Sequence, residues 1–313
     1  MKTAAIIPTR FASTRMLGKV LMDLCGHPMI WWVWKHTIQV REFDEVYIAA
    51  DDERVQRVCE KFGAKVIMTG TDCGCLIDRL FQVSKIVEAD YYISINGDEP
   101  LLEPEVMKAV LPDHVEMDKP VVRGLAREFT NPAEVIDPGN MKMVIGKGGY
   151  CLYHSRSPIP YPYTTTQFSY KKYVGVELFN KKALEFYVST EPTELEKIED
   201  IGALRFLEYG IPIHYDMVNS CSLSVDTPKD LAYIRGALIK KIEEETGHGT
   251  VYRTIFIMDI RKIAGADCHR QPIRIYHRVS AYLMEEQFYH FQYNAGFHLR
   301  CLPLSLNDSI LSD

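Results

Sequence analysis

The sequence lacks the features that mark membrane, secreted and zinc-binding proteins. None of its apolar runs reaches the roughly 20 residues that a transmembrane helix needs. The short apolar run at the start is interrupted by Pro8 and Arg10, which makes it a poor signal peptide. The eight cysteines contain no CxxC pair, since Cys73 and Cys75 are separated by one residue, so no structural zinc site is predicted. We therefore expect a cytoplasmic protein with reduced thiols and no membrane insertion.

The chain also lacks an excess of positive charge. Its 36 Lys and Arg residues are outnumbered by 42 Asp and Glu residues, which gives a formal net charge of −6 and argues against a nucleic-acid partner. Against this background, the segment IIPTRFASTRMLGK carries Arg10, Arg15 and Lys19 directly after an apolar run. A local basic cluster in an acidic protein favours a small anionic ligand.

The hydrophobic pattern predicts an α/β fold. Apolar, strand-like runs alternate with amphipathic helical stretches, which implies right-handed βαβ units and a mainly parallel sheet flanked by helices. From about Val121 the runs are longer and predict antiparallel strands. They are followed by a helix over residues 194–210, a strand over 222–226 and a long helix with Thr227 as its N-cap.

The pattern predicts one domain and an extension. The α/β alternation stops near residues 247–249, so we expect a domain over residues 1–246 and an extension over 247–313. The extension could be the stub of a fused domain, an interaction element or a disordered tail. Its aromatic residues argue against full disorder.

The loop after the first predicted strand is suited to a polyphosphate. Arginine binds phosphate oxygens in pairs, lysine adds a point charge, and backbone N–H groups at a turn complete such a site. The loop matches neither GxxxxGK[ST] nor GxGxxG. The alternative is a basic loop that is merely exposed to solvent, but the small residues Ser13 and Gly18 favour phosphate binding.

Two aspartates follow predicted strands. Asp98 lies in NGDEP and Asp226 lies in SVDTPKD. Ligands bind beyond the carboxyl ends of the strands in such sheets, and Mg²⁺ takes one or two carboxylates together with substrate phosphates. Each aspartate could instead cap the following helix, although Thr227 already fills that role after Asp226. The two carboxylates could therefore share one Mg²⁺.

Six motifs carry a family resemblance over residues 1 to about 245. In chain order they are IIPTRFASTRMLGKVL, GHPMI, VYIAADDERV, NGDEPLL, GYCLYHSRSPIP and SVDTPKDL. The chain resembles the 3-deoxy-manno-octulosonate (Kdo) cytidylyltransferases, also called CMP-Kdo synthetases. The resemblance implies a Rossmann-like fold of the nucleotide-diphospho-sugar transferase type, with a smaller antiparallel subdomain for the acceptor and for homodimer formation. It also implies transfer of CMP from CTP to an acidic acceptor, with pyrophosphate released.

The resemblance implies roles for individual residues. The catalytic residues would be Arg10, Arg15, Lys19, Asp98 and Asp226, of which Asp98 and Asp226 would hold Mg²⁺. The CTP-binding residues would be Pro8, Arg10, Ser13, Arg15, Lys19, Asp78, Arg79 and Asn96. The acceptor-binding residues would be Arg156, Tyr173 and Glu177. Such a site supplies position and charge, and no general base is assigned.

The acceptor half departs from the family pattern. Where the family has HxSGTDR, this chain reads CGCLIDR (residues 73–79), and its LIDR is closer to the VLDR of spore-coat polysaccharide cytidylyltransferases. Where the family has HxGxY, Tyr173 and Glu177 replace the His and the Tyr. Gly202 and Ala203 stand in place of a Glu-Gln pair.

These departures leave the acceptor open. It could be Kdo, another ulosonic acid such as amino-Kdo, or a phosphonate. Glu177 is expected to add a negative charge that repels a second carboxylate and pairs with an ammonium group. A catalytically silent nucleotide-binding module is the remaining alternative, and the retention of both Asp98 and Asp226 argues against it.

Overall fold

The computed structural model describes residues 1–12 and 16–246. The strands are β1 (Thr3–Thr9), β2 (Asp23–Leu24), β3 (His27–Pro28), β4 (Glu45–Ala50), β5 (Val66–Met68), β6 (Tyr91–Ile95), β7 (Val122–Glu128), β8 (Lys142–Ile145), β9 (Cys151–Ser155), β10 (Lys171–Asn180) and β11 (Ile213–Met217). The α-helices are α1 (Met29–Thr37), α2 (Glu53–Lys61), α3 (Leu76–Ser84), α4 (Pro104–Lys108), α5 (Pro132–Ile136), α6 (Lys181–Ser189), α7 (Glu194–Glu199), α8 (Ala203–Glu208) and α9 (Pro228–Thr246). Short 3₁₀ helices lie at Lys19–Leu21 and Lys147–Gly149. The expected extension from residue 247 lies outside the described residues.

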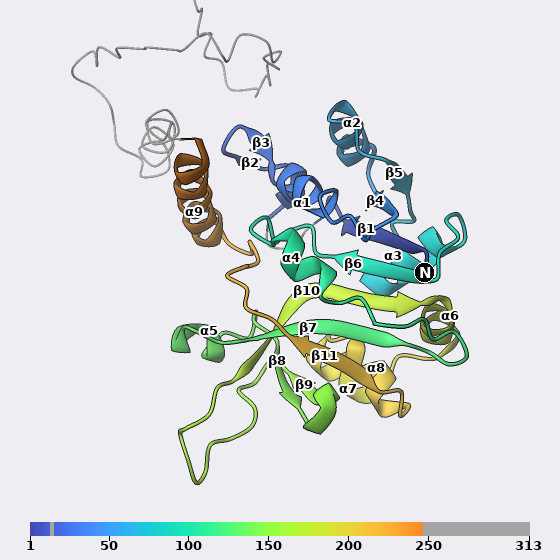
Figure 1. The fold of residues 1–313 in the computed structure, drawn as a ribbon, viewed down its shortest axis with the longest axis vertical. Coiled ribbons are helices and arrows are strands. Elements are labelled where there is room, and N and C mark those ends of the chain that lie inside the picture. The colour runs from blue at the N-terminus through green and yellow to red at the C-terminus, as the bar shows by residue number, and fades with distance from the viewer. Residues whose placement is uncertain (13–15, 247–313) are drawn as a thin grey trace, which may run out of the picture. The chain divides into compact units, whose positions relative to one another are not determined.

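Within the described residues, nine strands form one mixed sheet (Figure 1). The order is β11–β7–β10–β6–β1–β4–β5, and β8 pairs with β10 and with β9. β1 pairs in parallel with both β4 and β6, and β4 pairs in parallel with β5. These pairings confirm the predicted α/β class with a mainly parallel sheet. No described helix is long and apolar enough to cross a membrane.

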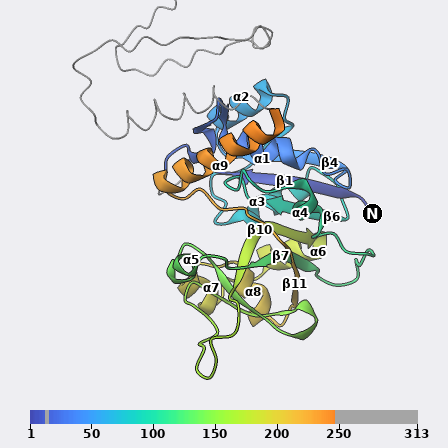
Figure 2. The same ribbon diagram turned by 60° about the vertical axis from the view of Figure 1, so that its left-hand side comes forward.

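β1 is apolar because both of its faces are covered. Ala4 and Ile6 enter one hydrophobic cluster, with residues of α3 and α6, whereas Ala5 and Ile7 enter a second cluster, with residues of α1 and α4. Alternate residues of a strand point to opposite faces, so a strand between two helical layers must be apolar throughout. A third cluster joins α9 to α1, and the two helices lie side by side in Figure 2.

The antiparallel strands continue the same sheet. β10 runs antiparallel between β6 and β7, with an irregularity between Val174 and Glu177, and the β8–β9 hairpin extends from it. The predicted antiparallel strands are therefore present. Because β10 lies inside the main sheet, the parallel and the antiparallel strands belong to one hydrogen-bonded sheet.

Two predictions of secondary structure are wrong. The helix expected over residues 194–210 is broken into α7 and α8, because Asp200 has a left-handed conformation with φ 53°. The expected strand over 222–226 is not a strand. Its apolar pattern reflects packing, since Val225 is fully buried and its N–H donates to Asp98 O at 2.9 Å.

Candidate active site

Lys19 joins three segments at the carboxyl edge of the parallel strands. Its Nζ lies 2.6 Å from Asp98 Oδ2 and 3.2 Å from Asp226 Oδ1. Lys19 comes from the loop after β1, Asp98 follows β6, and Asp226 precedes α9. The side chains are 12%, 25% and 24% exposed, respectively, so the charges meet in a partly desolvated place where their interaction is stronger than in water. The structure thus brings together three of the predicted catalytic residues.

Neither aspartate serves as a helix cap. α4 begins after Glu103, and no side chain caps it by a hydrogen bond. α9 begins with a reciprocal cap, in which the Asp230 N–H donates to Thr227 Oγ1 at 3.2 Å and the Thr227 N–H donates to Asp230 Oδ2 at 2.8 Å. The predicted N-cap role of Thr227 is therefore confirmed.

The donor set at this edge suits Mg²⁺ bound together with phosphates. Asp98 and Asp226 present carboxylate oxygens to one cation, the Lys19 ammonium. Among the described residues, no group of three or more His, Cys, Asp and Glu side chains could hold a metal ion. A divalent cation at Asp98 and Asp226 would need further oxygens from substrate phosphates and water, which is the usual arrangement for Mg²⁺.

The remaining residues of the basic loop are only partly described. Arg10 is exposed directly after β1, and Pro8 is half-buried near the end of that strand. The predicted residues Ser13 and Arg15 lie outside the described residues. Gly18 has φ +64°, and its N–H donates to Phe11 O at 2.9 Å. This bond joins the two sides of the loop immediately before Lys19.

Asp78 and Arg79, both predicted to bind CTP, make contacts within the protein. Asp78 Oδ2 accepts the N–H groups of Gly74 and Cys75, at 3.0 and 3.2 Å, at the start of α3. Arg79 is 5% exposed, and its guanidinium bonds to Asp51 Oδ2 at 3.2 Å and donates to the Thr69 hydroxyl. Arg79 is therefore buried among protein partners, and the carboxylate of the half-buried Asp78 is bonded to the backbone at the start of α3.

Glu99 is a buried carboxyl group that the sequence analysis did not single out. It is 4% exposed, and burial together with the neighbouring Asp98 charge raises the pKa of Glu99 to about 7. The predicted residue Asn96 lies 3.5 Å from it through Nδ2. A Cβ at Gly175 would lie 2.2 Å from Glu99 Oε1 and 2.7 Å from Asn96 Cβ, which leaves room for glycine only. The sequence signal that could have identified Glu99 is its position directly after Asp98 in the motif NGDEP.

The predicted acceptor residues are tied to the protein in this structure. Arg156 donates from Nε to Glu199 O at 2.6 Å, and from Nη1 and Nη2 to two further carbonyl oxygens, each at 3.0 Å. Glu177 is 6% exposed. Burial raises the pKa of Glu177 to about 7, although the phenols of Tyr173 and Tyr215 lower it in part. Near neutral pH, Glu177 therefore carries only part of the negative charge that the sequence suggested.

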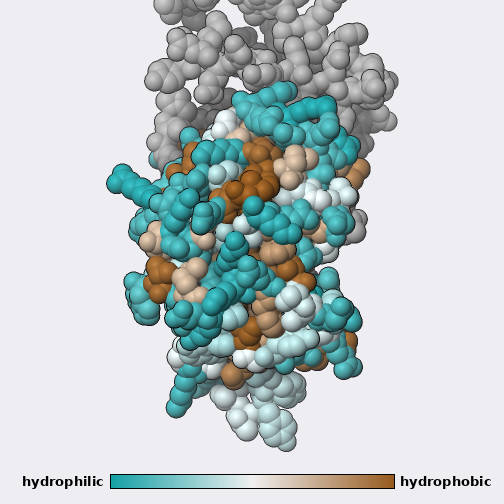
Figure 3. All heavy atoms as spheres, turned by 90° about the vertical axis from the view of Figure 1, so that its right-hand side faces the viewer, coloured by the Kyte–Doolittle hydropathy of each residue, from teal (hydrophilic) through white to brown (hydrophobic). Residues whose placement is uncertain are grey.

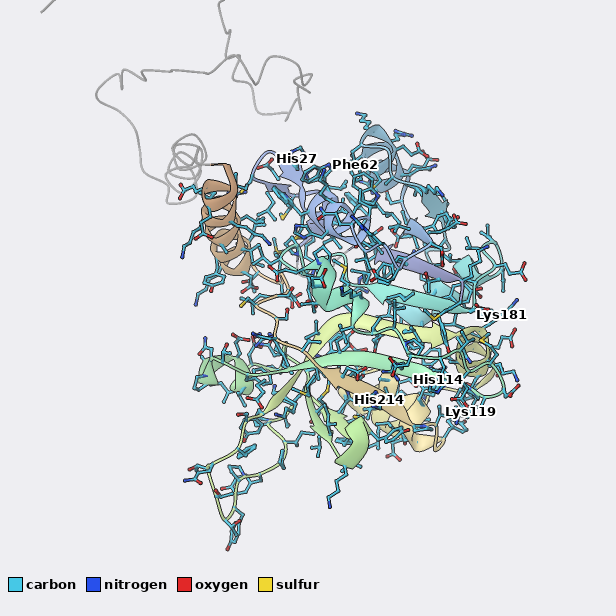
Figure 4. All side chains as sticks on the ribbon, viewed as in Figure 1. His27, Phe62, His114, Lys119, Lys181 and His214 are labelled. Atoms are coloured by element: carbon cyan, nitrogen blue, oxygen red, sulfur yellow. The ribbon has the colours of Figure 1, made fainter. Side chains whose placement is uncertain are left out.

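The opposite edge of the sheet has a different character. A cavity of about 270 Å³ lies there, next to the amino ends of β6 and β7 and lined in part by His114, which Figure 4 labels. Its Arg123 is already paired with Asp216 at 2.5 Å. Figure 3 views this side of the molecule, where hydrophilic side chains predominate and hydrophobic ones form separate, smaller patches. The converging charges at the carboxyl edge make that edge the better candidate site.

Comparisons with known proteins point to the same chemistry. The cytidylyltransferase family model matches residues 4–215. A 3-deoxy-manno-octulosonate cytidylyltransferase of Escherichia coli is 35% identical over 243 residues, which cover 78% of this chain and 98% of the relative. The enzyme of that name from Chloroherpeton thalassium is 35% identical over 246 residues, which cover 78% of this chain and 100% of the relative.

Solved structures agree with the sequence comparisons. A CMP:2-keto-3-deoxy-manno-octonic acid synthetase complexed with CTP has a TM-score of 0.71 and 35% identity, and the match covers 77% of this chain and 100% of that one. An inositol-1-phosphate CTP transferase from T. maritima has a TM-score of 0.57 at 17% identity, and covers 77% of this chain and 96% of that one. The second likeness shows the fold alone.

Proposed function

Because the chain belongs to the cytidylyltransferase family, and within it to the 3-deoxy-manno-octulosonate cytidylyltransferases, we propose that it transfers CMP from CTP to an acidic sugar acceptor. The leaving group is pyrophosphate, and the acceptor is Kdo or a related ulosonic acid. The observation that carries this proposal is the contact of Lys19 with both Asp98 and Asp226 at the carboxyl edge of the sheet.

The protein's part in the reaction is to supply position and charge. Arg10, Arg15 and Lys19 bind the triphosphate and neutralise the charge that develops on the departing pyrophosphate. Asp98 and Asp226 hold Mg²⁺, which, when bound, polarises the phosphate under attack. The Asn96 N–H donates to Gly175 O at 2.8 Å, and this hydrogen bond fixes the backbone shortly before Asp98.

For the acceptor, an amine-bearing acid is a second candidate. Glu177 has no ion-pair partner among the described residues, and a buried carboxyl group gains from a cationic partner. An ammonium group on the acceptor would favour the ionised form of Glu177, while Arg156 would hold the acidic end. The names of the relatives support plain Kdo as the acceptor, whereas the buried carboxyl group of Glu177 supports amino-Kdo or an aminophosphonate.

Pyrophosphate release tests the proposal. The purified chain is incubated with CTP, Mg²⁺ and one of three acceptors, which are Kdo, its amino analogue and an aminoalkylphosphonate. We expect release with at least one sugar acid, dependence on CTP rather than UTP, and strong loss in Lys19→Ala. No release with any acceptor, from protein that still binds CTP, would favour the silent nucleotide-binding module.

The predicted homodimer belongs to this proposal. Large apolar side chains are exposed in and next to the antiparallel part of the sheet: Leu152 of β9 (64%), Ile136 of α5 (75%), and Tyr161 and Tyr163 of the segment between β9 and β10 (81% and 88%). Among the described strands, β9 pairs in the sheet with β8, and an isolated antiparallel bridge joins Tyr150, directly before β9, to His214 of β11. A second copy would bind along the part of the β9 edge that follows this bridge. Light scattering on wild type and Leu152→Lys tests this, and a wild-type monomer at micromolar concentration would refute it. The cytoplasmic location stays a prediction.

A further inference from the structure

A single residue, Phe11, holds both sides of the basic loop. Its N–H donates to Asp51 Oδ1 at 3.0 Å, and its carbonyl accepts the Gly18 N–H at 2.9 Å. A Cβ at Gly18 would lie 3.1 Å from the Phe11 ring, which leaves the ring little room to move. Lys19 follows Gly18 directly, so the hydrogen bonds of the Phe11 backbone help to fix the position of the Lys19 residue.

Asp51 is in turn fixed by a buried cation. Arg79 Nη2 lies 3.2 Å from Asp51 Oδ2, and the two side chains are only 6% and 11% exposed. The other Arg79 nitrogen, Nη1, donates to the Thr69 hydroxyl. Thr69 itself is held by the carbonyl of Ala50, which accepts its N–H at 2.8 Å. The pair therefore links the ends of β4 and β5 and the start of α3 to the basic loop.

The ring of Phe11 is held as well. The Arg54 guanidinium carbon lies 3.5 Å from its centroid, and Arg54 is oriented by bonds of 2.8 and 2.6 Å to the Asp52 carboxylate. A guanidinium stacked on an aromatic face is a favourable cation–π contact. Backbone and ring of Phe11 are thus both anchored to residues that follow β4.

We propose that Asp51 and Arg79 are positioning residues, which preset the triphosphate-binding loop through Phe11 and do not themselves contact the nucleotide. This proposal rests on the proposed function in one respect, namely that the ligand of the loop is CTP. It assigns Arg79 a role different from the direct CTP contact that the family resemblance implies. A site organised before binding saves the cost of ordering the loop when the ligand arrives.

The direction in which Asp51→Asn changes the affinity for CTP distinguishes a positioning role from a purely electrostatic one. Asp51→Asn keeps the size of the side chain and removes a negative charge close to the loop. If only charge mattered, removing it would strengthen the binding of a triphosphate. Positioning predicts the opposite, because the neutral amide holds Arg79 less firmly. We expect kcat/KM for CTP to fall about ten- to a hundredfold, mainly through a higher KM.

Asp44→Asn is a matched control at the far ends of β1 and β4. Asp44 Oδ2 accepts the Thr3 N–H at 2.8 Å and the Thr3 hydroxyl at 3.0 Å. Like Asp51, it is a carboxylate that links β1 to the chain around β4, but it lies away from the basic loop. The control should lower the thermal midpoint without changing the CTP constants.

The experiment combines CTP kinetics and calorimetric CTP affinity with residue-resolved amide exchange at Phe11 and Gly18 in the ligand-free protein. Both amides should exchange faster in Asp51→Asn and be unchanged in Asp44→Asn. Thr69→Val removes one Arg79 contact without changing charge, and should give a smaller effect of the same sign if Asp51→Asn does not fold. Tighter CTP binding in Asp51→Asn, or unchanged exchange at both amides, would overturn the proposal.

A double-mutant cycle tests whether Arg79 also touches the nucleotide. If Arg79 acts through Asp51, adding Arg79→Met to Asp51→Asn should weaken CTP binding no further. A further loss of tenfold or more in the double variant would show direct contact and overturn the positioning role. Wild-type protein that binds no CTP would instead refute the proposed function, while the amide exchange would still report on the loop.

Discussion

Replacing Lys19 with methionine tests whether Asp98 and Asp226 form a cation site. Because both oxygens bond to one nitrogen, they lie no more than about 6 Å apart, at which two negative charges repel by about 1–3 kcal/mol for effective dielectric constants of about 20–80. Without the Lys19 ammonium this repulsion is uncompensated. We therefore expect Lys19→Met to unfold more readily than wild type in metal-free buffer, by about that amount.

Magnesium should reverse the loss. A divalent cation would replace the missing charge, so the thermal midpoint of Lys19→Met should rise with millimolar Mg²⁺ and gain more than that of wild type, although turnover stays low. Lys241→Met is the control, since Lys241 pairs with Glu103 at 3.1 Å on an exposed surface. The reasoning fails if Mg²⁺ stabilises Lys19→Met no more than this control.

Three further variants probe neighbouring parts of the site. Asp226→Asn should lose most CTP turnover, yet keep its thermal midpoint because other residues cap α9; a large drop in that midpoint would point to a structural role. Gly175→Ala should lose about 1–3 kcal/mol in urea unfolding, since a Cβ would clash with Asn96 Cβ as well as with Glu99. Glu177→Gln tests the carboxyl pKa of about 7, which lies above its unfolded value of 4.5. Wild type should lose stability as pH rises from about 4.5 to 7, and Glu177→Gln should show less of this loss.

The first half of the fold follows directly from the sequence. β1, β4 and β6 all coincide closely with apolar runs of the sequence. Such runs are informative because a strand buried on both faces leaves no place for polar residues. The break at Asp200 was missed because a left-handed conformation is uncommon for a residue other than glycine, and the local sequence does not mark Asp200 for it.

The site was predictable only in part. Asp98 and Asp226 stood out because each follows an apolar segment, and the structure brings them to one lysine. The burial of Arg79 depends on partners distant in sequence, such as Asp51, whereas Asp78 bonds to the nearby N–H groups of Gly74 and Cys75. A family motif predicts which residues are present, but it does not distinguish a ligand contact from a buried support.

The insertion of β10 between β6 and β7 constrains how the chain can be synthesised and altered. While the chain grows, one edge of β6 has no partner until residues 96–170 have been made and β10 follows. A fragment that ends before Lys171 exposes an apolar strand edge, which invites aggregation. The two functional halves are therefore not exchangeable modules. Changes of acceptor must arise by substitution of side chains on a shared sheet, because replacing β10 would also unpair β6, the strand that precedes Asp98.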